Sequence, residues 1–244
     1  MGDFFQNGTI ATLHDFRSRT TEELEAELKS FSAYRPMEIV LPCLCSELEG
    51  DALPAIVEEI SRTNYLNHVV IGLDRADREQ FEYAYEFFCG LKQPFSILWN
   101  DGPRLRAIQQ ELEDVGLGPT EAGKGRNVWY SIGFVNARGK ADAVALHDCD
   151  VLTYERRLLA RLLYPMANPN FQFEFCKGYY PRVAEGKMNG RANRLLVGPL
   201  LLALERVLGP SDYLSSMRGF RYLLAGEVSF RRALIPELRL PSDW

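Results

Sequence analysis

The sequence predicts an α/β fold with a mostly parallel central sheet and flanking helices. Three apolar, strand-like runs alternate with helix-like segments in the first half of the chain, and a fourth run follows at residues 143–146. Strands that alternate with helices in this way are typical of parallel sheets with right-handed crossovers. Polar residues follow each run, and open α/β sheets bind ligands at the carboxyl ends of their strands.

Each element of the first half has its own signal. Residues 1–19 form an arm, and Thr20 or Thr21 caps a helix with an acidic first turn. Apolar residues at strand or helix spacing define the elements that follow. We expect strands at 37–41, 68–73 and 95–99, and helices at 53–60, 78–91, 105–115 and 128–137.

The half after residue 150 has a different pattern. We expect strands at 172–176 and 179–183, a loop at 186–190, a long amphipathic helix at 194–208, and a turn with a helical run at 223–232. No flexible linker separates the halves. The sequence therefore predicts one domain with two subregions.

Composition excludes several classes of protein. The net charge of −5, from 28 basic and 33 acidic residues, argues against a broad nucleic-acid surface. Five cysteines without paired metal-type spacing predict the reduced thiols of a cytoplasmic protein, and Cys43 and Cys45 are wrongly spaced for a zinc knuckle. The N-terminus lacks a secretory signal, and the longest apolar stretch, residues 195–204, is too short to span a membrane.

Two aspartates follow the fourth strand-like run. One residue separates Asp148 from Asp150, so strand geometry sends both side chains to one side. Such a pair suits a hard divalent cation that carries phosphate oxygens. The alternative is a pair of turn and helix-capping aspartates. His147 points to the opposite face, and we interpret it as structural.

A glycine-rich segment opens the helix before that strand. Two glycines flank Lys124, so the backbone can approach a ligand closely while the helix amides and the lysine attract an anion. The segment is not a P-loop, because the upstream glycine and the following Ser or Thr are missing. A plain turn into a helix is the alternative.

The residues after the first strand can cradle a base or ribose, with Glu47 accepting from hydroxyls or amides. A helix cap by Ser46 or Glu47 is the alternative. Asp74 and Asp77, after the second strand, carry the same ambiguity, and we favour capping for Asp77.

The second half offers an anion-binding candidate and a candidate acid. Arg191 and Asn193, beside Gly190, can hold a phosphate or carboxylate at the start of a helix, unless they form a solvated basic turn. Glu227 is a candidate acid, or an ordinary helix cap.

Taken together, these residues resemble the glucosyl-3-phosphoglycerate and mannosyl-3-phosphoglycerate synthases, which are retaining, metal-dependent glycosyltransferases of the GT-A fold. The resemblance covers residues 38–244 and rests on the order and spacing of its parts. Those parts are the strand end at 41–42 with Glu47, the glycine turn at 123–125, Asp148-Cys149-Asp150, Lys177 with its tyrosine-rich hairpin, the segment 189–194, the apolar run 196–201 and Ala225-Gly226-Glu227.

The resemblance implies a role for each candidate. Asp150 holds Mg²⁺ or Mn²⁺ and, with Glu227 near the transferred sugar, forms the catalytic set. The residues implied to bind the nucleoside diphosphate sugar are Pro42, Leu44, Glu47, Lys124 and Asp148, the last contacting ribose or metal. The residues implied to bind the acceptor are Gly190, Arg191 and Asn193, and Asn193 stands where the family often has Thr.

The implied reaction moves a hexose from UDP-glucose, GDP-glucose or GDP-mannose to 3-phosphoglycerate or glycerate, with retention, in compatible-solute synthesis. Residues 1–154 would bind the nucleotide sugar and residues 155–244 the acceptor. The resemblance also implies a continuation beyond Trp244 with a histidine metal ligand and a donor-binding arginine, and leaves a homodimer open. The alternatives are a GT-A enzyme with a lipid or polysaccharide acceptor, a nucleotidyltransferase, and a non-catalytic nucleotide-sugar-binding relative.

Overall fold

A computed structural model describes residues 10–14, 18–118, 121–180, 183–184, 187–188 and 191–241. The chain forms two compact units. The first, which we call the sheet unit, comprises Arg19–Cys176 and Glu227–Trp244; the second, the helical unit, comprises Met1–Ser18 and Lys177–Gly226. The predicted division at residue 154 concerns binding roles, so it stays a prediction.

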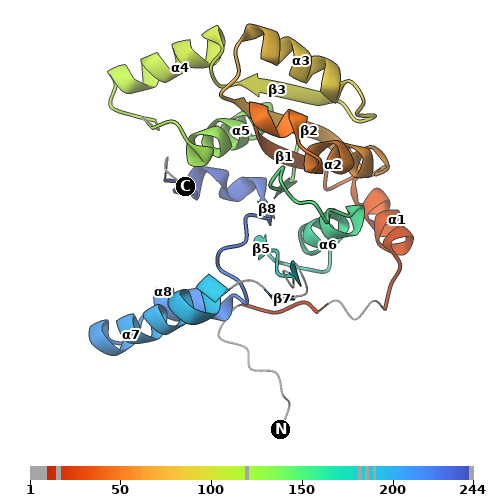
Figure 1. Cartoon of the computed structure of the whole chain (residues 1–244). Helices are drawn as coiled ribbons and strands as arrows, with labels where there is room; N and C mark the ends of the chain where they lie inside the picture. Colours follow the sequence, from red (N-terminus) through yellow and green to blue (C-terminus); the bar gives the residue numbers. More distant parts are fainter. Residues whose placement is uncertain are drawn as a thin grey trace. The chain divides into compact units, whose positions relative to one another are not determined.

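A six-stranded sheet organises the sheet unit, in the order β3-β2-β1-β4-β8-β5. Strands β1 to β4 are parallel to one another, and β8 runs antiparallel to β4. The predicted mostly parallel α/β sheet is therefore confirmed (Figure 1). The strand bounds are β1 Met37–Leu44, β2 Leu66–Asp74, β3 Phe95–Trp99, β4 Ala143–Leu146, β5 Phe175–Lys177 and β8 Val228–Arg231.

The two faces of the sheet carry separate cores because successive strand residues point to opposite sides. Ile39 and Ala145 face a large core completed by helices α1, α2, α3 and α6. Val40 and Val144 face a smaller core completed by α5 and by the 3₁₀ helix η3, Arg232–Glu237. Burial on both faces explains why the central strands are continuous apolar runs.

Helices follow the strands as the sequence predicts, although their ends differ by a few residues. Thr20 caps the first helix with a reciprocal Glu23 contact, and Asp77 caps the third in the same way with Gln80. No helix among the described residues is both long and apolar enough to cross a bilayer. The bounds are α1 Thr21–Phe31, α2 Ala52–Ser61, α3 Arg78–Phe88, α4 Pro103–Asp114, α5 Lys124–Arg138 and α6 Arg156–Ala167.

Two predictions for the second half are wrong, and a third is only partly right. The expected helical run at 223–232 contains strand β8, which pairs with β4 and buries Val228 and Phe230. The expected loop at 186–190 contains strand β7, Lys187–Met188, paired with β6, Val183–Ala184. The expected strand at 172–176 is reduced to β5. Strand pairing decides these segments, whose local patterns are weak.

The predicted helix at 194–208 is present but irregular. It begins with a π-helical turn, η2 (Asn193–Val197), before α7 (Gly198–Leu208), and the Gly198 amide donates to the Asn193 carbonyl. A further helix, α8 (Asp212–Gly219), follows within the helical unit. Several leucines here are exposed: Leu195, Leu196, Leu200 and Leu202.

Candidate active site at the carboxyl ends of the strands

The strand order creates an opening beside β1. The chain builds β1, β2 and β3 in one direction and then places β4 on the other side of β1. The gap between the carboxyl ends of β1 and β4 is thus the topological switch point, where open α/β sheets bind ligands.

Pro42 lies at this opening. The Val40 carbonyl accepts from the His147 amide, so Val40 and, two residues on, Pro42 face the β4 side. Strand β4 pairs only as far as Val40, so the position where Pro42 lacks an amide has no strand partner. Proline is tolerated in this central strand because its pairing with β4 has already ended.

The residues after β1 form a short 3₁₀ helix, η1, Cys45–Glu49. The Glu47 carboxylate accepts a hydrogen bond of 2.7 Å from the Leu44 amide, so Glu47 caps this helix. This contact agrees with the alternative interpretation of Glu47 as a helix cap. The Leu44 side chain is exposed at the strand end.

The loop after β4 brings the aspartate pair to the same opening. Lys124 forms an ion pair with Asp148, while Asp150 is exposed. His147 is fully buried on the opposite face, with its ring 5.3 Å from that of Tyr154. The predicted opposition of His147 and Asp148 is confirmed. Burial lowers the pKa of His147 to about 3, so the ring is neutral.

The charges of Asp148 and Asp150 act on the Glu47 carboxylate. Burial raises the pKa of Glu47 above its ordinary value; the Leu44 amide opposes that shift, and the charges of Asp150 and Asp148 add to it. Mutual repulsion of this kind is relieved when a cation enters the group. Carboxylate oxygens from two loops suit a hard divalent cation, so the donor set fits Mg²⁺ or Mn²⁺.

Helix α5 starts earlier than predicted, at Lys124 rather than residue 128. Lys124 therefore lies in the first helical turn, where unpaired amides favour an anion. The helix lies close to β2 at Gly72, whose carbonyl accepts a 2.7 Å hydrogen bond from Asn127. A Cβ on Gly72 would lie 2.5 Å from Ser131 Oγ and closer still to Asn127 Oδ1. Only glycine permits this approach.

A buried ion pair joins the end of β2 to the first turn of α5. Arg126 donates a 3.0 Å hydrogen bond to Asp74, which also accepts from Asn100 at 3.3 Å. The side chains of Asp74 and Arg126 are only 2% and 9% exposed. We did not predict this pair from the sequence. The available signal was an aspartate at the end of β2 and an arginine in the glycine-rich segment, and both lie at the same sheet edge.

Glu227 lies beside the same strand end. Val228 pairs with Leu146, so the residue before β8 is next to the residue after β4. Glu227 is 1% exposed and therefore no surface helix cap.

The predicted acceptor residues belong to the helical unit. Arg191 is exposed, and Gly190 lies outside the described residues. Asn193 accepts from the Leu223 amide at 3.3 Å and donates to the Arg221 carbonyl at 3.4 Å, so it ties two segments of this unit together. It also lines a hollow of about 340 Å³, together with Arg194 and Arg218.

A larger hollow of about 550 Å³ lies beside α3 and the amino end of β3, between Tyr85 and Lys92. It is remote from the carboxyl strand ends, and its walls carry no carboxylate. Volume alone is therefore a poor guide to the site in this fold.

No protein-family model matches the chain. It is 45% identical over 244 residues to the glucosyl-3-phosphoglycerate synthase of Persephonella marina, covering 100% of this chain and 60% of that protein. It is 36% identical over 245 residues to the synthase of the same name from Methanococcoides burtonii, covering 99% and 59%. These similarities confirm the predicted resemblance to the glucosyl-3-phosphoglycerate synthases.

The fold has a counterpart of known structure. A crystal structure of glucosyl-3-phosphoglycerate synthase from Mycobacterium tuberculosis, in complex with Mn²⁺, UDP and glucosyl-3-phosphoglycerate, superimposes with a TM-score of 0.61 at 20% identity. The match covers 91% of this chain and 64% of that one. The predicted GT-A fold is thereby confirmed. The chain spans about three fifths of the length of the two curated relatives.

Proposed function

We propose that this chain carries the donor site of a glucosyl-3-phosphoglycerate synthase, an enzyme that moves glucose from UDP-glucose to 3-phosphoglycerate with retention of configuration. The observation that carries the proposal is the Lys124–Asp148 ion pair after β4, with Glu47, after β1, within electrostatic reach of Asp148 and Asp150. The similarity to two curated synthases over nearly the whole chain supports it, and favours glucose over mannose.

The loop after β1 would hold the nucleoside. Leu44 offers an exposed apolar surface to a base, and Pro42 leaves the space beside it free of a strand. The Glu47 carboxylate already accepts a hydrogen bond from the Leu44 amide. A carboxylate has a second oxygen, which could accept a hydrogen bond from a ribose hydroxyl. These contacts would orient the donor with its diphosphate towards α5.

The diphosphate would lie between α5 and the aspartate loop. Asp150, assisted by Asp148, would hold Mg²⁺ or Mn²⁺, which when bound stabilises negative charge on the departing diphosphate. Lys124 adds a fixed positive charge, and the first-turn amides of α5 add their dipole. The Asp148 ion pair keeps the Lys124 ammonium at the opening before the donor arrives.

The acceptor would be held by its anionic groups. Arg191 supplies a guanidinium suited to a phosphate or carboxylate. Asn193 supplies an amide near the start of a helix. Glu227 would lie near the transferred sugar. The acceptor hydroxyl then attacks on the face that the diphosphate leaves, so no carboxylate pair spaced as in a retaining glycosidase is required.

The test is metal-dependent binding of UDP-glucose to this chain, measured by calorimetry with and without Mn²⁺. Asp150→Asn keeps the shape of the side chain but removes its charge, and we expect at least an approximately 100-fold loss of Mn²⁺-dependent affinity, about 2.7 kcal/mol. Asp114→Asn, at the exposed end of α4, is the matched control and should bind as the parent does.

Equal Mn²⁺-dependent affinity in Asp150→Asn and the parent would refute the assignment. Product analysis by nuclear magnetic resonance after incubation with 3-phosphoglycerate tests the acceptor and the configuration separately. We expect the anomeric configuration of the donor in the product.

A further inference from the structure

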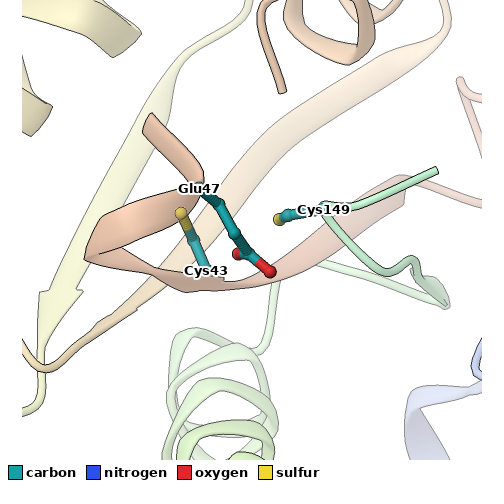
Figure 2. A group of neighbouring side chains, drawn as sticks. All are labelled: Cys43, Glu47 and Cys149. Atoms are coloured by element: carbon teal, nitrogen blue, oxygen red, sulfur yellow. The ribbon is translucent and has the colours of Figure 1, made fainter. Parts of the chain in front are cut away.

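Two cysteines and a glutamate meet beside the aspartate pair. Their ligand atoms, the sulfurs of Cys43 and Cys149 and a carboxylate oxygen of Glu47, all lie within 4.8 Å of one another. Figure 2 shows Cys43 and Cys149 on either side of Glu47, one from the end of β1 and the other from the loop after β4. Both cysteines are buried and neither forms a disulfide.

Their chemistry differs from that of the aspartates. Thiolates prefer softer divalent cations such as Zn²⁺, whereas carboxylates and phosphates suit Mg²⁺ and Mn²⁺. Two sulfurs and one carboxylate oxygen are three of the four ligands of a tetrahedral zinc site, and water can take the fourth position. The proposed donor function makes no use of either thiol.

The spacing is close to that of a formed site. Sulfurs bound to one tetrahedral zinc at about 2.3 Å each lie about 3.8 Å apart. The ligand atoms lie within 4.8 Å of one another, so closure needs a movement of about 1 Å at most. Glu47 is partly exposed, which gives a cation a way in.

We propose that Cys43, Glu47 and Cys149 form a second cation site, selective for thiophilic divalent ions such as Zn²⁺. On binding, each thiol releases its proton to solvent and becomes a thiolate ligand. The bound ion ties the end of β1 to the loop that carries Asp148 and Asp150. The inference does not rest on the proposed function, because its two thiol ligands take no part in donor binding and its preferred ion is different; Glu47 is the one residue that the two sites share.

The test is titration of the reduced chain with Co²⁺, because cobalt bound to thiolate gives a sulfur-to-metal charge-transfer band that oxygen ligands do not give. We expect one Co²⁺ per chain with this band, and displacement of the Co²⁺ by Zn²⁺. Cys43→Ser and Cys149→Ser each keep one thiol of the cluster, so each should weaken the band and bind Zn²⁺ more weakly by at least roughly 10- to 100-fold. The double variant Cys43→Ser/Cys149→Ser should lose the band.

Three further variants separate the explanations. Cys89→Ser replaces an exposed cysteine outside the cluster and should keep the band. Asp150→Asn should also keep it while losing Mn²⁺-dependent UDP-glucose binding, so failure of the two proposals is distinguishable. Glu47→Gln keeps both thiols and should retain the band with weaker affinity.

Thermal melting shows which variants are folded. The decisive measurement uses the parent chain, so it does not depend on the folding of any variant. Absence of the charge-transfer band in the parent overturns the proposal. Persistence of the band in the double variant Cys43→Ser/Cys149→Ser overturns it equally.

Discussion

Substitution of Gly72 by alanine tests how α5 is seated on the sheet. The new Cβ would lie 2.8 Å from Asn127 Cγ and 2.5 Å from Ser131 Oγ, so the Asn127 amide must move. Overpacking of this kind costs about 1–3 kcal/mol. Loss of the buried hydrogen bond to the Gly72 carbonyl adds about 1–3 kcal/mol. We expect the free energy of unfolding to fall by about 2–6 kcal/mol.

The assay is urea unfolding followed by circular dichroism. Gly133→Ala is the matched control, because Gly133 is an exposed residue of α5 with no atom within 4 Å of the position of a Cβ. This variant should raise the free energy of unfolding by up to about 1 kcal/mol. In the double variant Gly72→Ala/Asn127→Ala the closest clash is absent, so the two losses should fall short of additivity by about 1 kcal/mol or more.

The same substitution reports on the site. A displaced α5 carries Lys124 away from Asp148, so Gly72→Ala should also weaken UDP-glucose binding. The reasoning is refuted if Gly72→Ala unfolds within about 0.5 kcal/mol of the parent, a margin typical of uncoupled changes, or if the two losses add without coupling.

Two further predictions concern buried charge. Arg126→Met leaves the Asp74 carboxylate buried without its ion-pair partner and should lower the free energy of unfolding in urea by about 3–5 kcal/mol. The double variant Arg126→Met/Asp74→Asn should recover part of that loss. Equal stability of the single and the double variant would contradict the role of the buried charge. The pKa of His147 is 6.5 in the unfolded chain and about 3 in the folded chain. Below pH 6.5 the unfolded chain therefore binds a proton that the folded chain does not, and the free energy of unfolding decreases as the pH is lowered. Between pH 7 and pH 5 the parent should therefore lose about 2 kcal/mol more than His147→Phe, and parallel pH profiles would show that this ring is not the cause.

The parts of the fold that follow from local pattern were predictable. The strand at 95–99 has the predicted bounds, and Thr20 and Asp77 cap the helices that they were expected to cap. These features depend on residues within a few positions of each other, where side-chain spacing and capping chemistry act directly.

The segments decided by long-range pairing were not predictable in the same way. Val228–Arg231 is a strand because β4 offers it an open edge, and nothing in its own four residues requires this. The first turn of α5 likewise makes a contact that is distant in the chain, the hydrogen bond from Asn127 to the Gly72 carbonyl.

The same distinction holds for the site. The sequence by itself determined which chemistry is present: an aspartate pair after a buried strand, a lysine between glycines, and a glutamate after the first strand. Only the tertiary structure decided which groups meet, because the order of strands brings the ends of β1, β2 and β4 to one edge. It paired Lys124 with Asp148 and Arg126 with Asp74, and it placed Cys149 beside Cys43, contacts that no local spacing encodes.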